Sequence, residues 1–150
     1  MKKILGLWTM LALMLVGSLV ISSCGPTLGP AFQKADNVPE NVGVVYIYRP
    51  PKGIGGGVYY DVKANQSVVT TLYNGGYFAY FCKPGETEFS AKTESTSSVT
   101  VDVKPGQIYY VKGTVGIGFL VGRPHLSVES PEIGEKEIAE CKLIPQETKQ

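Results

Sequence analysis

Few residues in this chain have the types and the spacing that enzyme chemistry requires. His125 is the single histidine, and it follows Arg123-Pro124, a pair that predicts a loop. A Ser-His-Asp triad requires a histidine base, yet no G-x-S-x-G turn presents a serine to His125. One histidine and scattered acidic residues also lack the spacing typical of a metal site. We therefore predict a protein that is not an enzyme and that holds no cofactor and no metal.

The glycine-rich segment 52–57 (K-G-I-G-G-G) is the stretch that most resembles a phosphate-binding loop. A P-loop requires Gly-Lys-Ser/Thr at its end and a helix after it. Here the glycines lead into Val58-Tyr59-Tyr60, which is a strand pattern. We therefore interpret the segment as a flexible loop between two strands.

The carboxylates and tyrosines of the chain are also compatible with a function that involves glycans. Glu86, Glu88, Glu94 and Asp102 lie close together along a predicted meander, and paired carboxylates can hydrolyse glycosides. The chain also has nine tyrosines, and those that face outward could form an aromatic platform. The alternative function is thus a glycan-binding or glycan-active module that uses exposed tyrosines and strand carboxylates. The simpler interpretation is a solvated strand face and ordinary sheet aromatics.

The N-terminal run predicts where the protein goes. Lys2-Lys3 gives a basic start, residues 5–21 are almost all apolar, and Ser22-Ser23 places small side chains before Cys24. This order is typical of a secretory signal with a cleavage site. With a cysteine at the cut, the segment resembles the signal and lipobox of a bacterial lipoprotein.

Two other interpretations of this run are a transmembrane helix and a soluble export signal. The run is barely long enough to span a bilayer, which needs roughly 20 apolar residues. Gly25-Pro26 would also break a helix at the cut. The resemblance instead implies a signal peptide over 1–23 and acyl chains, including palmitate, on Cys24. Several acyl chains anchor a protein stably in a membrane. Gly25, where a retained lipoprotein would have Asp, indicates the outer membrane of a bacterial cell envelope.

Charge excludes one class of partner. The chain has 14 Lys+Arg and 13 Asp+Glu, and removal of Lys2 and Lys3 leaves 12 basic against 13 acidic residues. A net charge of −1 gives no electrostatic basis for nucleic acid binding. The partners that we expect are the membrane, through Cys24, and an envelope protein.

Cys82 and Cys141 would remain in the exported domain, where an oxidising compartment permits a disulfide. Cys82 alternates with Phe78 and Tyr80 on a predicted core strand, and Cys141 follows Ile138 by three residues on a predicted helix. We expect both to point into one interior. A bridge would close a loop of about 60 residues and contribute about 4 kcal/mol. Two unlinked, buried thiols are equally compatible with the sequence.

Short apolar segments separated by turn residues predict an all-β domain. The expected strands are 43–49, 58–63, 67–73, 77–83, 87–92, 99–103, 107–114 and 126–129, with 116–122 a strand or a bend. Two K-P-G-x sequences predict type II turns with Gly85 and Gly106 at positive φ. Seven or eight short antiparallel strands at this spacing suggest a β-sandwich.

A short helix should close the domain. Ser130 is a suitable N-cap before Pro131, which predicts a helix over 131–142 that Gly134 weakens. The expected organisation is a signal at 1–23, a lipidated Cys and flexible tether at 24–41, a β-sandwich domain at 42–145 and a disordered tail at 146–150.

Several motifs follow one another with a familiar spacing over about 42–144. They are V-V-Y-I-Y-R-P, N-G-G-Y-F, K-P-G-E-T-E-F, V-K-P-G-Q-I-Y-Y-V and E-C-K-L-I. In these motifs the domain resembles the bacterial envelope family catalogued as domain of unknown function 2846. The resemblance implies a fold and an envelope location, and it transfers no active site. The loop 52–57 and Cys82 depart from the family pattern. The expected function is a non-enzymatic, lipid-anchored envelope protein that binds or braces another envelope component.

Overall fold

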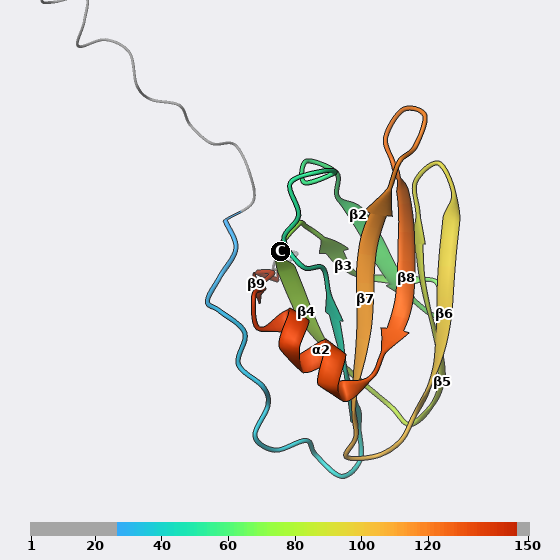
Figure 1. Ribbon diagram of the computed structural model, residues 1–150. Helices are drawn as coiled ribbons and strands as arrows, with labels where there is room; N and C mark the ends of the chain where they lie inside the picture. The colour runs from blue at the N-terminus through green and yellow to red at the C-terminus, as the bar shows by residue number, and fades with distance from the viewer. Residues whose placement is uncertain (1–26, 147–150) are drawn as a thin grey trace, which may run out of the picture.

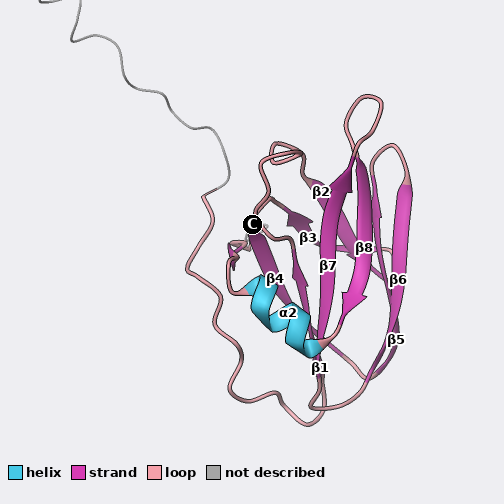
Figure 2. Cartoon of the chain, in the orientation of Figure 1, coloured by secondary structure: helices cyan, strands magenta, loops and turns pink. Residues whose placement is uncertain are grey.

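Nine strands in two sheets and one short helix make up residues 27–146, the part of the chain that this computed structural model describes (Figures 1 and 2). The predicted all-β class with one short C-terminal helix is confirmed. The predicted signal peptide, Cys24 and the tail beyond residue 146 lie outside the described residues.

The two sheets pack face to face. The five-stranded sheet has the order β8-β7-β1-β4-β9, and the four-stranded sheet has the order β3-β2-β5-β6. The first contains β1 (Gly43–Tyr48), β4 (Gly76–Cys82), β7 (Ile108–Gly116), β8 (Arg123–Glu129) and β9 (Lys142–Leu143). The second contains β2 (Tyr60–Ala64), β3 (Ser67–Leu72), β5 (Gly85–Lys92) and β6 (Thr96–Val103).

Two strand pairs differ from the predicted antiparallel arrangement. β1 pairs with β7 in parallel, and β4 pairs with β9 in parallel. A parallel pair requires a long connection between its strands. The chain between β1 and β7 supplies it, because that stretch contains the entire four-stranded sheet.

β1 is the central strand of the larger sheet and is buried along its whole length. Val45 and Ile47 point into the core between the two sheets. Val44, Tyr46 and Tyr48 belong to a second apolar cluster on the other face of the sheet. Successive side chains of a strand alternate between faces, so one strand contributes to both clusters.

The helix α2 (Pro131–Ile138) packs over this second cluster (Figure 1). Ser130 caps it, as predicted, and its side chain accepts a hydrogen bond from the Ile133 N–H. A Cβ at position 134 would lie only 2.3 Å from Cγ of Tyr110, so Gly134 permits the close approach of helix and sheet. The helix ends at Ile138, earlier than predicted, because the following residues extend into β9.

The segment predicted as a flexible tether packs against the domain instead. The Gly29 N–H donates to the Leu143 carbonyl at 2.7 Å, and the Phe32 N–H donates to the Cys141 carbonyl at 3.0 Å. The Phe32 ring meets the rings of Tyr46 and Tyr77 edge-on, each at 5.1 Å between centroids. The tether prediction is therefore wrong for 29–35, because Phe32 completes the cover of a sheet face that the short helix leaves partly open.

The region around His125 also differs from the prediction of a loop. Pro124 and His125 lie within β8 and pair with Val115 and Thr114 of β7. Proline is tolerated here because β8 is the edge strand of its sheet. Residues 117–122, predicted as a strand or a bend, form the loop between β7 and β8.

Both K-P-G turns place glycine at positive φ, as predicted. φ is 71° at Gly106 and 127° at Gly85. Only the first matches the type II value near 80°. A hydrogen bond of 3.3 Å from the Gln107 N–H to the Lys104 carbonyl closes that turn.

We predict that Gly106→Val lowers the free energy of unfolding by about 1–2 kcal/mol, because a branched side chain is strained in the left-handed region. A Cβ at Gly106 would meet nothing within 4 Å, so the loss comes from backbone strain alone. The matched control is Gly53→Val, since Gly53 has open space and no positive φ. Urea unfolding of both variants measures the difference, and equal stabilities would contradict the turn assignment.

Candidate functional site

The four large apolar side chains that are more than 80% exposed lie at one end of the sandwich. They are Ile54 (89% exposed), Ile117 (91%), Phe119 (90%) and Leu120 (84%), and Val121 (53%) follows Leu120 in the same loop. We call these five residues the apolar end. They lie in the β1–β2 and β7–β8 loops, which meet at the same end because β1 and β7 run parallel (Figure 1).

The bases of the two loops lie side by side. A Cβ at Gly55 would lie 3.4 Å from Cγ1 of Val115, and a Cβ at Gly122 would lie 3.7 Å from Cγ2 of Val58. The two apolar loops are therefore neighbours at their bases.

Arg49 holds the first loop. Its guanidinium donates to the Val58 carbonyl at 2.5 Å and to the Gly55 carbonyl at 2.7 Å, and it lies 5.9 Å from the centre of the Tyr60 ring. Arg49 is 3% exposed, and this burial lowers the pKa of its guanidinium. A buried charge requires polar partners, and here backbone oxygens supply them. The contacts make a glycine-rich loop, predicted as flexible, into an ordered one.

Glu94 holds the second loop from the tip of the β5–β6 hairpin. Its carboxylate accepts hydrogen bonds from the N–H groups of Phe119 (2.7 Å), Leu120 and Val121 (2.5 Å). These backbone hydrogen bonds lower the pKa of Glu94. The neighbouring Thr93 hydroxyl donates to the Gly122 carbonyl at 2.5 Å. One carboxylate thus holds the backbone N–H groups of three successive residues, and the side chains of these residues stay in solvent.

Of the carboxylates singled out in the sequence, Glu86 and Asp102 face each other across the β5–β6 ladder, and both are exposed on the outer face of the sheet. Glu94 is engaged by the loop amides, and Asp102 pairs with Lys104 at 2.6 Å. Glu86 and Glu88 are exposed on β5, as the simpler interpretation predicts.

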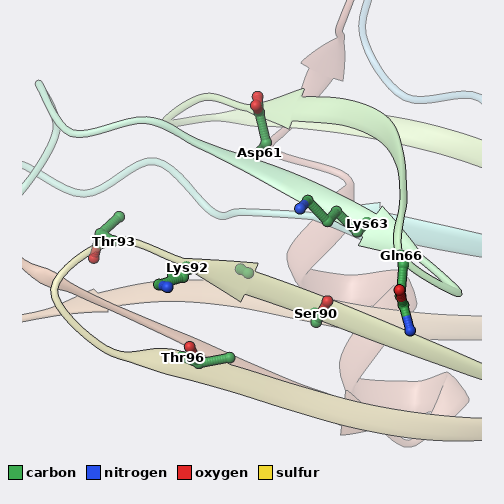
Figure 3. A pocket seen from close by; sticks show the side chains of 8 residues that line it. Asp61, Lys63, Gln66, Ser90, Lys92, Thr93 and Thr96 are labelled. Carbon is green, nitrogen blue, oxygen red and sulfur yellow. The ribbon is translucent and has the colours of Figure 1, made fainter.

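A shallow depression of about 670 Å³ lies on the outer face of the four-stranded sheet (Figure 3). Its lining residues are Asp61, Lys63, Gln66, Ser90, Ala91, Lys92, Thr93 and Thr96. This lining contains one carboxylate and no tyrosine, so it lacks the groups that the glycan alternative requires.

The tyrosines do not form an outward platform either. Tyr46, Tyr48, Tyr77 and Tyr110 are buried in the cluster beneath α2, and Tyr60 is buried in the core between the sheets. The Tyr48 hydroxyl donates to Glu137 at 2.8 Å, and burial raises the pKa of Tyr48.

Tyr59 is the one tyrosine among residues 27–146 that is mostly exposed, at 62%. Its ring packs against the Tyr73 ring at a tilt of 38°, with 5.4 Å between ring centres.

The two described cysteines lie on opposite faces of the five-stranded sheet. Cys82 is in the core between the sheets, whereas Cys141 is in the cluster beneath α2, and both are free thiols. The expectation that both point into one interior is therefore wrong, and the disulfide does not form in the structure. Burial raises the pKa of Cys82 and raises that of Cys141 to about 12.

The histidine and the possible metal ligands named in the sequence do not come together into a site among the described residues. His125 is exposed on β8, and residues 27–146 contain no group of three His, Cys, Asp or Glu residues placed to hold a metal ion. Within the same residues, no helix is long and apolar enough to span a membrane.

No protein-family model matches the chain, and a search of curated proteins finds no significant match. The resemblance to domain of unknown function 2846 stays a prediction from the motifs.

Sequence reasoning missed the apolar end as a functional feature. The signal was present in the segment 116–122 (G-I-G-F-L-V-G), where glycines surround four large apolar residues without the alternation of a half-buried strand. Such a pattern is compatible with a buried strand, and only the structure shows the side chains in solvent.

We predict that Cys82 and Cys141 each react with an alkylating reagent when the domain is denatured without reductant. Both should resist the same reagent in the native state, because a buried thiol with a raised pKa supplies little thiolate. Peptide mass spectrometry measures both labels. A pair of unlabelled cysteine peptides joined by a disulfide would contradict the structure.

We predict that Glu94→Ala speeds hydrogen exchange at the amides of Phe119, Leu120 and Val121, because the carboxylate is their acceptor. The folded pKa of Glu94 is lowered, so in the wild type the carboxylate is ionised and the protection is present at neutral pH. It is lost as the pH falls through that lowered value. Glu88→Ala is the matched control on the same strand-and-hairpin unit. Unchanged exchange in Glu94→Ala would show that Glu94 does not order the loop.

Proposed function

We propose that this chain is a non-enzymatic, lipid-anchored protein of the bacterial cell envelope that binds or braces another envelope component through its apolar end. The observation that supports a binding role is the exposure of Ile54, Ile117, Phe119 and Leu120, each above 80%. Clustered apolar side chains on a protein surface mark an interaction site.

The order of the loops also supports binding. A loop that is already fixed loses little conformational freedom when it meets a partner. Arg49 and Glu94 fix the two loops through hydrogen bonds to their backbones. The apolar side chains are thus presented in a defined arrangement before any contact is made.

The anchor in this proposal is Cys24. Its support is the sequence Ile21-Ser22-Ser23-Cys24 after an apolar run, which resembles a lipobox. Acylation there would place the domain at the membrane, on the outer membrane by the sorting argument from Gly25.

The glycan-related alternative has less support. Most tyrosines are buried, and Glu86 and Asp102 face each other on an exposed strand face outside the depression, so these groups do not create the concave aromatic site that it needs. We therefore propose no second function.

We predict that labelled palmitate enters the wild-type protein and that Cys24→Ala abolishes both the labelling and the lipoprotein-type cleavage. Metabolic labelling followed by gel analysis measures both effects. Cys82→Ala is the control, because it removes a buried thiol that the proposal does not acylate. A wild-type protein that stays unlabelled and is exported in soluble form would overturn the anchor.

A photoreactive phenylalanine analogue at position 119 tests the binding role in the native envelope. We expect adducts from position 119 and none from the same analogue at Glu88, which is exposed away from the apolar end. Adduct formation that is equal at the two positions would contradict a binding surface at the apolar end.

A further inference from the structure

The apolar end and the point where the chain leads back to Cys24 lie at the same end of the sandwich. Gly29 is hydrogen-bonded to Leu143 of β9, and Leu143 pairs with Tyr77 near the start of β4. Tyr77 in turn pairs with Tyr48, the last residue of β1. The β1–β2 loop with Ile54 follows directly from there, so the docked segment begins at the end of the sandwich where the apolar loops lie (Figure 1).

This arrangement limits how far the domain can lie from its anchor. Four residues lie between Cys24 and Gly29, and the five residue steps from one to the other span about 17 Å in a fully extended chain. A tether over the whole of 24–41 would allow several times that reach and any orientation. Because the segment is docked from Gly29 onward, the end that carries the apolar loops is the end nearest the anchor.

We propose that the apolar end rests in the surface of the phospholipid bilayer in which Cys24 is acylated, an inference that rests on the proposed lipid anchor. The occupant of this surface is lipid, so the envelope component that the apolar end contacts is the membrane itself. Phe119, Leu120 and Ile117 enter the boundary between headgroups and acyl chains, and Ile54 enters beside them. The acyl chains and the apolar end then form two contacts with one membrane and set the orientation of the domain.

The chemistry of the apolar end suits a lipid surface. Aromatic and aliphatic side chains at the tip, with cationic residues around them, are typical of segments that lie in a membrane interface. Lys52 and Arg123 are exposed at the bases of the two loops, where they can meet lipid phosphates. The carboxylate closest to the tip, that of Glu94, already accepts three amide hydrogen bonds.

A tryptophan scan in the full acylated protein tests this inference. The one tryptophan of the chain, Trp8, lies in the predicted signal, so the processed protein has none of its own. Phe119→Trp places a reporter in the apolar end. Ile133→Trp is the matched control, because Ile133 is 47% exposed on α2 near the opposite end of the sandwich. Both proteins are reconstituted into vesicles of phosphatidylethanolamine and phosphatidylglycerol.

We expect the emission of Phe119→Trp to shift to shorter wavelength on reconstitution and to be quenched by lipids with brominated acyl chains. The emission of Ile133→Trp should change in neither way. Leu120→Trp is a second reporter, and quenching of either apolar-end variant alone supports the inference.

Absence of quenching in both apolar-end variants, or equal quenching in Ile133→Trp, would overturn the inference. Mass spectrometry of the same samples separates this result from a failure of the proposed function. An acylated protein without quenching keeps its anchor and loses only the membrane contact of the apolar end. A protein without acyl chains loses the anchor, and the inference with it.

Discussion

The burial of β1 on both faces is the constraint on which the rest of this structure depends. A strand with apolar residues at every position needs cover on two sides, and one sandwich core covers only one. The four-stranded sheet covers Val45 and Ile47, while α2 and Phe32 cover Tyr46 and Tyr48. The cover on this second face comes from Phe32, which precedes β1, and from α2, which follows β8. Residues near both ends of the described chain therefore pack against the same strand.

That double cover gives the N-terminal segment a structural role. Because Phe32 packs with Tyr46 and Tyr77, the chain before β1 is held to the domain and not free to swing. The attachment shortens the link to Cys24 and directs one end of the sandwich towards it. If Cys24 is acylated as proposed, the packing of Phe32 then helps to set the orientation of the domain at the membrane.

The apolar end follows from a different interaction, that between charged side chains and loop backbones. Arg49 and Glu94 have opposite charges, yet both satisfy backbone groups of loops that would otherwise lack regular hydrogen bonds. The result is a pair of ordered loops with exposed apolar side chains. In this protein Arg49 and Glu94 fix the loops, and the exposed apolar side chains of those loops are left to contact a partner.

The local features of the fold could be predicted from the sequence because a few residues determine each of them. The alternation of Val99, Val101 and Val103 indicates a half-buried strand, Pro105-Gly106 determines a turn, and Ser130-Pro131 starts a helix. The partners of Cys82, Glu94 and Phe32 could not be predicted, because each lies in contact with residues far along the chain. Which residues meet at long range depends on the order of strands in the two sheets. By itself, then, the sequence determined the strands, the turns and the candidate lipobox. Only the tertiary structure decided that the two cysteines lie on opposite faces of the larger sheet and that the apolar loops share an end with the docked segment at Gly29. The parallel pairing of β1 with β7 brings the two loops together, and the parallel pairing of β4 with β9 places the docked segment at that end.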